Sequence, residues 1–334
     1  MLRASPVLRT LAALLVTASP LLAQTKVNVD EKLPVYVKSS DGISGNVKSI
    51  GSDTMNNLMT LWQQGFKEHY PNVVLEVEGK GSSTAPPALV AGTASFGPMS
   101  RPMKDKELAE FEKVHGYKPV GLPAAIDMLA VYVHKDNPIR SLTLQQVDAI
   151  FSKSRNGGLD KDIVTWGDLG LTGEWASKPI ALYGRNSASG TYGYFKEYAL
   201  FGGDFKDSVS EQAGSSSVVQ SVATDKFAMG YSGIGYITAD VRAVPLADKA
   251  GAEPIAATPE NAYTNEYPLA RFLLVYVNHK PGGQLDPLRR EFLRYMFSRD
   301  GQLVVVKDGY YPVPARVAAQ ALKSVGLESP KQPL

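Results

Sequence analysis

Residues 46–84 read NVKSIGSDTMNNLMTLWQQGFKEHYPNVVLEVEGKGSST. Apolar and polar residues alternate over 46–50 and 73–77, as in half-buried strands, whereas apolar residues over 55–66 recur at helical spacing. The stretch therefore predicts a strand, a helix and a second strand. Another helical pattern covers 144–151. Strands that alternate with helices predict an α/β fold.

The chain is long enough for two folded units. Its 334 residues are about twice the ~150 residues that one domain commonly has. Two apolar segments, 127–133 and 272–277, are flanked by prolines and separated by about the length of one unit. We expect the first segment to carry the chain into a second lobe and the other to bring it back. The serine-rich stretch 208–217 is predicted to be a loop.

The composition excludes several classes of protein. Hydrophobic residues make up 44% of the chain and charged residues 20%, which excludes disordered, collagen-like and polytopic membrane proteins. The chain has no cysteine. Disulfides, thiolate metal sites and a cysteine nucleophile are therefore excluded as well.

Residues 1–23 have the layout of a secretory signal peptide. Arg3 and Arg9 come before an apolar run over 11–16, and Ala23 ends the segment. The run is far shorter than the ~20 residues that span a bilayer, so we expect cleavage near Ala23 and a periplasmic or extracellular protein. Removal of two of the 35 basic residues leaves as many as the 33 acidic ones. The mature chain is then neutral and has no general field to attract nucleic acid.

Three loops have a composition suited to an oxyanion. They read GSDT over 51–54, GSST over 81–84 and RNSASGT over 185–191, and each opens a helix, the last over 192–200. A helix N-terminus offers unpaired N–H groups and about half a positive charge, while glycine lets an anion approach and hydroxyls donate. Any one such loop also fits an ordinary helix cap. The three together, with the fork of Arg185, predict a small oxyanion encircled by both lobes.

Motifs of several other functions are absent from the sequence. It has no G-x-x-x-x-G-K-[ST] phosphate loop, no G-x-G-x-x-G dinucleotide signature, no H-E-x-x-H and no G-x-S-x-G nucleophile elbow. No cluster of Asp, His and Glu has metal-ligand spacing. We therefore predict binding without chemistry, and neither a metal nor a cofactor.

Five segments of the chain resemble a known family. They read SIGSDTMNNL, EGKGSSTAPPALVAGTASFGPMSRPM, TWGDLG, YGRNSASGTYGYF and GYSGIGY. Together they resemble the phosphate-binding component of the high-affinity phosphate ABC transporter, in its pseudomonad-like branch. The resemblance implies a type II periplasmic binding protein, with two α/β lobes joined by a two-stranded hinge and the ligand in the cleft. The implied lobes are 24–125 plus 267–334 and 126–266.

The resemblance also implies a ligand, a partner and a set of site residues. The ligand is inorganic phosphate, the partner is the inner-membrane permease of the transporter, and the protein is expected to be a monomer. The family's three motifs match this sequence at specific positions. The implied ligand contacts are Ser52, Asp53, Thr54, Ser82, Arg185, Ser189, Gly190 and Thr191.

One position departs from the best-known branch of the family. There an aspartate accepts the phosphate proton and rejects sulfate, whereas here the matching residue is Ser100, which we still expect to contact the ligand. A carboxylate only accepts hydrogen bonds, but a hydroxyl can also donate to an unprotonated anion. We hypothesise that Asp127 or Asp53 supplies the missing acceptor. The alternative is that Asp127 only pairs across the hinge.

Arg101 either pairs with an acidic side chain or adds positive charge to the cleft.

Two other functions remain open at this point. A secreted phosphatase on the same fold would use Asp53 and Thr54 as a nucleophile pair, although the sequence offers no metal cluster or catalytic triad. A receptor for sulfate, arsenate or another tetrahedral oxyanion would use the same loops.

Overall fold

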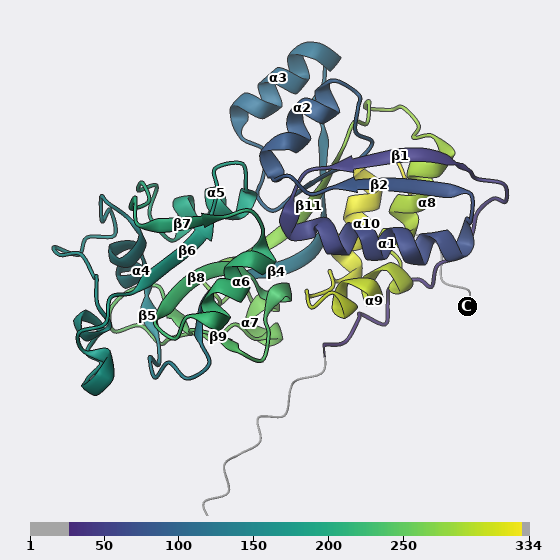
Figure 1. Ribbon diagram of the computed structural model, residues 1–334. Helices are drawn as coiled ribbons and strands as arrows, with labels where there is room; N and C mark the ends of the chain where they lie inside the picture. Colours follow the sequence, from purple (N-terminus) through teal and green to yellow (C-terminus); the bar gives the residue numbers. More distant parts are fainter. Residues whose placement is uncertain (1–26, 329–334) are drawn as a thin grey trace, which may run out of the picture.

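Two long strands run side by side through the middle of the computed structural model, which describes residues 27–328. They are β4 (Val120–His134) and β11 (Ala270–Val277), and they pair antiparallel (Figure 1). They contain the two apolar segments predicted to cross between lobes. The signal peptide predicted over 1–23 lies outside the described residues.

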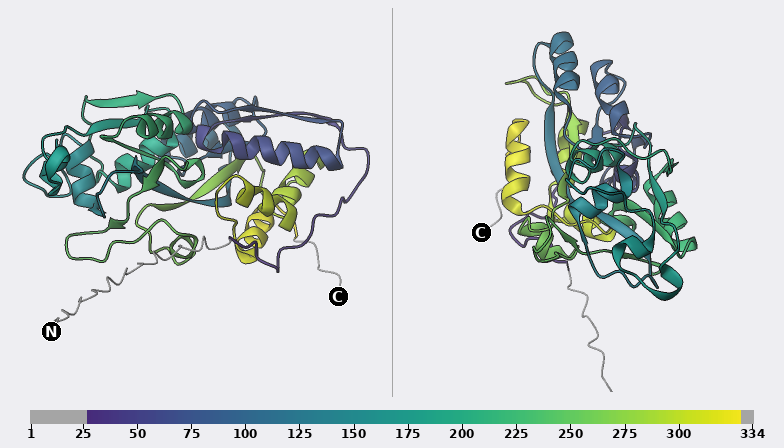
Figure 2. Two further views of the ribbon diagram at one scale, coloured as in Figure 1. Left: turned by 60° about the horizontal axis from the view of Figure 1, so that its bottom comes forward. Right: turned by 90° about the vertical axis from the view of Figure 1, so that its left-hand side faces the viewer.

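The first half of the molecule lies at the right and top of Figure 1 and contains both the start and the end of the described chain. Figure 2 shows α8 and α9 beside α1, although they are far apart in the sequence. The elements of this half are β1 (Gly45–Ile50), η1 (Asp53–Met55), α1 (Asn56–His69), β2 (Val73–Glu78), η2 (Ser82–Thr84), α2 (Ala85–Val90), β3 (Gly97–Met99), α3 (Asp105–His115), α8 (Pro287–Met296), α9 (Arg299–Lys307) and α10 (Ala315–Ser324).

The second half lies at the left of Figure 1 and is built from the middle of the chain. Its elements are β5 (Leu142–Thr143), α4 (Leu144–Phe151), η3 (Trp166–Leu169), η4 (Gly173–Trp175), β6 (Ala181–Arg185), α5 (Gly190–Tyr198), β7 (Val209–Gln212), α6 (Ser215–Thr224), β8 (Ala228–Gly233), η5 (Ile234–Tyr236), β9 (Val241–Ala243), β10 (Leu246–Ala247) and α7 (Pro259–Tyr263).

Strand β4 belongs to both halves because it changes partner along its length. It pairs with β11 up to Met128 and with β8 from Leu129 onward. The strand order is β3-β11-β4-β8-β6-β7, with β9 also paired to β4. Met128 and Leu129 are fully buried. The chain thus passes between the halves inside one continuous strand.

The predicted elements around the first two loops are confirmed with small shifts. β1 and β2 pair in parallel, and α1 lies between them in the sequence. Leu58, Met59, Trp62 and Phe66 form the buried face of α1, in keeping with its helical spacing. The helix predicted over 144–151 has those bounds in the structure.

The prediction of a loop over 208–217 is wrong. β7 pairs in parallel with β6 at the edge of the sheet, and α6 begins at Ser215. Ser210 and Glu211 of β7 are exposed, which is compatible with a strand at a sheet edge. The serine content of this stretch therefore reflects an edge strand and the first turn of a helix.

Candidate functional site

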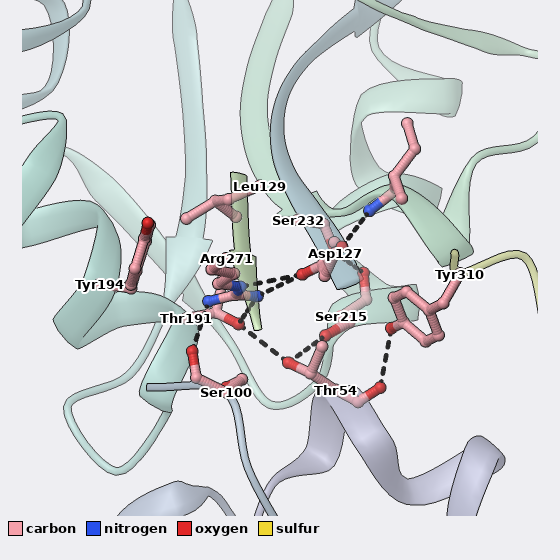
Figure 3. Close-up of polar contacts among 12 residues, drawn as sticks. Thr54, Ser100, Asp127, Leu129, Thr191, Tyr194, Ser215, Ser232, Arg271 and Tyr310 are labelled. Carbon is pink, nitrogen blue, oxygen red and sulfur yellow. Dashed lines mark hydrogen bonds and ion pairs between the residues drawn. The ribbon is translucent and has the colours of Figure 1, made fainter. Parts of the chain in front are cut away.

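The three predicted loops meet where the two halves face each other; Figure 3 shows Thr54 of the first loop beside Thr191 of the third. Thr54 Oγ1 from the first loop lies 2.8 Å from Thr191 Oγ1 on the other half. The Ser83 amide in the second loop donates to the Ala188 carbonyl in the third at 3.1 Å. A groove of about 710 Å³ lies beside these contacts, between residues 101–105 and helix α5.

Helix α5 points its first turn into this cluster. Ser189 caps the helix, since its Oγ accepts from the amides of Thr191 at 3.1 Å and Tyr192 at 3.4 Å. The helix begins two residues earlier than predicted, so Gly190 and Thr191 form its first turn. A Cβ at Gly190 would lie 2.6 Å from Ser100 Oγ and closer still to Ser82 Oγ. Glycine is therefore required for the close approach of α5 to the other half.

Three serines of the first half gather at the same place. The fully buried Ser82 Oγ accepts from the Ser100 amide at 3.0 Å and lies 3.2 Å from Ser100 Oγ. The Ser52 amide donates to the Pro98 carbonyl at 2.8 Å. Its buried hydroxyl has no hydrogen-bond partner within residues 27–328. An unpaired buried hydroxyl is costly, so Ser52 is a candidate ligand donor.

Arg185 brings a buried positive charge to the cluster from the end of β6. Its Nη1 donates to Ser215 Oγ at 2.8 Å, and its Nη2 lies 3.2 Å from Asp53 Oδ2. Burial lowers the pKa of the guanidinium, and the Asp53 carboxylate opposes that shift. Arg185 Nε is buried and has no partner within the described part of the chain. One donor of the fork is therefore available to a ligand.

Sequence reasoning missed Arg271, at the start of β11, and Ser215, at the start of α6. Arg271 Nε and Nη2 donate to Asp127 Oδ2 at 2.9 and 2.7 Å. Asp127 Oδ1 accepts from the Ile234 amide at 2.9 Å. Both side chains of this ion pair are buried, with 2% of Arg271 and none of Asp127 exposed. Asp127 begins one apolar crossing segment and Arg271 directly precedes the other, and these opposite charges are the sequence signal that could have suggested the pair.

The sequence left two roles open for Asp127 and two for Arg101, and the structure shows the partners of both side chains. Asp127 pairs across the crossing strands with Arg271, and both of its oxygens already accept hydrogen bonds. Arg101 pairs with Glu107 at 2.7 Å and also donates to Ser83 Oγ at 3.2 Å. Its charge is therefore matched by an acidic side chain.

Two tyrosines hold the backbone of the first loop. Tyr310 donates to the Thr54 carbonyl at 2.9 Å, and Tyr236 from the second half donates to the carbonyls of Asp53 and Thr54, each at 3.2 Å. Burial raises the pKa of both phenols, so they stay protonated and act as donors. These contacts fix Thr54 between the two halves.

Asp308, two residues before Tyr310, gives a pH-dependent prediction. Burial raises the pKa of its carboxyl to about 6, and its Oδ2 has no partner among the described residues. The stabilisation from this raised pKa is complete below about pH 4 and is lost as the pH rises through about 6. We expect Asp308→Asn to raise Tm at pH 7.5 by about 2–4 °C, or about 1 kcal/mol, and to change it little at pH 4. Thermal unfolding at both pH values measures this difference, and an equal shift at both would contradict it.

The ten residues predicted for the site lie in one cluster, and their roles in binding stay a prediction. Within residues 27–328 no group of three His, Asp or Glu side chains is placed to hold a metal ion. The cluster contains hydroxyls, helix N–H groups and the N–H of Arg185 Nε, which has no partner among the described residues, while its two carboxylates are paired with arginines. Such a donor set suits an oxyanion better than a cation.

The comparisons with known proteins agree with this fold. Residues 37–300 match the model of a PBP superfamily domain, the class of two-lobed binding protein that the architecture indicates. The chain is 57% identical to the phosphate-binding protein PstS of Pseudomonas aeruginosa, over 96% of this chain and 99% of that protein. The chain belongs to the PstS family of phosphate-binding proteins.

Solved structures show the same fold. One from Clostridium perfringens, assigned as a phosphate ABC transporter substrate-binding protein with bound phosphate, has a TM-score of 0.67 and 26% identity. The match covers 80% of this chain and all of that one. An ABC-type phosphate transport receptor from Vibrio cholerae has a TM-score of 0.62 and 22% identity over 80% of this chain and 100% of that one, which shows the fold alone.

Proposed function

We propose that this protein captures inorganic phosphate between its two halves and delivers it to the permease of an ABC transporter. The observation that carries the proposal is a pair of buried polar atoms, Ser52 Oγ and Arg185 Nε, that have no partner in residues 27–328 and lie within a cluster of hydroxyl and amide donors. The names of the Pseudomonas and Clostridium proteins support phosphate as the ligand.

The lobes of this mechanism are proposed to be 24–125 plus 267–334 and 126–266, with β4 and β11 as the hinge. In the open form, phosphate would first meet the hydroxyls of the first lobe. Closure would then bring the second lobe onto the remaining oxygens. A ligand shifts such an equilibrium only through contacts that the closed form alone makes. The proposed contacts are Ser52, Thr54, Ser82 and Ser100 on one side and Arg185, Ser189, Gly190 and Thr191 on the other.

The proposed function is binding without catalysis. A phosphatase that used Asp53 as a nucleophile would need a free carboxylate at the ligand. Asp53 Oδ2 instead accepts from the Ser215 amide at 2.8 Å and pairs with Arg185. We expect purified protein not to turn over a chromogenic phosphate monoester. Turnover that is lost in an Arg185 variant would favour the enzyme instead.

The proposed location is the periplasm, and the proposed state is a monomer without a nucleic-acid partner. The location rests on the signal peptide expected over 1–23. No helix in residues 27–328 has the length and apolar character needed to cross a membrane.

Calorimetry with phosphate and sulfate side by side tests the ligand. We expect saturable binding of one phosphate per chain and much weaker binding of sulfate. Comparable affinity for both anions would contradict the phosphate assignment and leave a general receptor for tetrahedral oxyanions. Arsenate, which carries protons as phosphate does, is expected to behave like phosphate.

A further inference from the structure

Arg271 is a buried basic residue of the cluster that the proposed contacts do not use. It lies on β11, directly opposite Asp127 on β4. Its Nη1 donates to the Ser100 carbonyl at 2.8 Å, and its Nη2 donates to Thr191 Oγ1 at 3.0 Å. One guanidinium therefore contacts both halves of the molecule at the site (Figure 3).

The guanidinium of Arg271 is held on several sides. Asp127 accepts two of its N–H groups, and the Tyr194 ring lies 5.3 Å from its central carbon. Tyr194 is itself fixed, since its hydroxyl donates to the Ala270 carbonyl at 2.8 Å. Four of the five N–H donors of an arginine are thus accounted for, and the side chain is 2% exposed. The guanidinium of Arg271 is therefore poorly placed to bind a ligand directly, because its N–H groups are already held by these partners.

The bond from Arg271 decides which way the Thr191 hydroxyl points. Arginine has no acceptor, so Thr191 Oγ1 must accept in this contact and its own proton is left to donate elsewhere. Thr54 Oγ1 on the other half lies 2.8 Å away and can accept that proton. A hydroxyl fixed in this way donates to an anion without first having to reorient.

We propose that Arg271, held by Asp127, is a positioning residue that fixes the Thr191 hydroxyl as a hydrogen-bond donor to phosphate. The inference rests on the proposed function and goes beyond it, since it assigns roles to two charged residues that act through Thr191. The competing explanation is an ion pair that only joins the two crossing strands. The two explanations differ in whether the effect of Arg271 depends on Thr191.

A double-mutant cycle separates the two explanations. Asp127→Asn with Arg271→Met removes both charges together, so no buried charge is left unpaired, and the asparagine oxygen can still accept from Ile234. Thr191→Val removes the hydroxyl while keeping the shape of the side chain. Phosphate affinity is measured by calorimetry for the unchanged protein, the paired variant, Thr191→Val and the combined variant.

We expect the paired variant and Thr191→Val each to weaken phosphate binding by about tenfold, the size of one hydrogen bond. When Thr191→Val is added to the paired variant, it should weaken phosphate binding further by less than about twofold, because the Thr191 hydroxyl is no longer oriented there. The inference would be overturned if Thr191→Val weakened phosphate binding equally in the unchanged protein and in the paired variant, or if the paired variant kept its affinity. The proposed function would still stand in either case. Failure of the unchanged protein to bind phosphate would overturn both.

If the paired variant does not fold, Arg271→Lys provides a second test of the inference. Lysine keeps the charge beside Asp127 but lacks the planar fork, so it cannot serve Asp127, Ser100 and Thr191 together. We expect Tm close to that of the unchanged protein and affinity about tenfold weaker. Unchanged affinity in this variant would show that the ion pair alone matters. Arg242→Lys, at an arginine outside the site that donates to Asn137 and Ile139 carbonyls, is the control and should bind phosphate normally.

Discussion

Arg185→Met is expected to lower the affinity for phosphate by about a thousandfold. Arg185 Nε is buried and has no partner among the described residues, and loss of this guanidinium would remove the charge-assisted bonds proposed for the anion. It also leaves the Asp53 carboxylate without its partner and close to the bound anion. Truncation of one member of a buried charge pair costs about 2–5 kcal/mol, and each 1.4 kcal/mol is about tenfold in affinity.

The matched control for this variant is Arg242→Met, which removes an arginine from the same half of the molecule. Arg242 donates to the Asn137 carbonyl at 3.1 Å and lies outside the site. Calorimetry should show phosphate affinity within about twofold of the unchanged protein for the control. An Arg185→Met protein that is folded and keeps its affinity within tenfold would contradict the central role given to this residue.

Gly190→Ala is expected to weaken phosphate binding by about a hundredfold because it keeps the two halves apart. The added Cβ would lie 2.6 Å from Ser100 Oγ and nearer to Ser82 Oγ, and both serines are fully buried. Overpacking of this kind costs about 1–3 kcal/mol. The cost applies only to the form in which α5 meets the first half, so the open form should fold normally. Calorimetry gives the affinity, and small-angle X-ray scattering with and without phosphate gives the compaction on binding.

Gly193→Ala in the same helix is the control for Gly190→Ala. Its Cβ would meet only the flexible Arg101 side chain, at 3.3 Å from Cδ. Alanine also favours helices over glycine, so we expect normal compaction and affinity within a few-fold. Full compaction with phosphate in Gly190→Ala would show that the close approach at this residue is not needed for closure.

The loops could be predicted from the sequence because their chemistry is local. Glycine, hydroxyl residues and a helix start lie within a few positions of one another around Ser52, Ser82 and Ser189. The architecture followed from alternating strand and helix patterns and was made specific by the resemblance of whole motifs. Local patterns failed at the polar edge strand β7, whose serines resemble those of a loop.

The residues that escaped prediction depend on contacts between distant parts of the chain. Arg271 meets Asp127 only through the register of β11 on β4, which no local pattern reports. Ser215 reaches Arg185 because α6 follows an edge strand that was not foreseen. Each of these residues would look like an ordinary polar position in its own segment.

The two ion pairs have a consequence for how phosphate reaches the site. Asp53 offsets Arg185 and Asp127 offsets Arg271, so each buried guanidinium carries its own counter-charge. An approaching anion then meets little net charge until it is within hydrogen-bonding distance. Dissolved salt has correspondingly little attraction to screen. We therefore expect phosphate capture by this receptor to depend little on ionic strength.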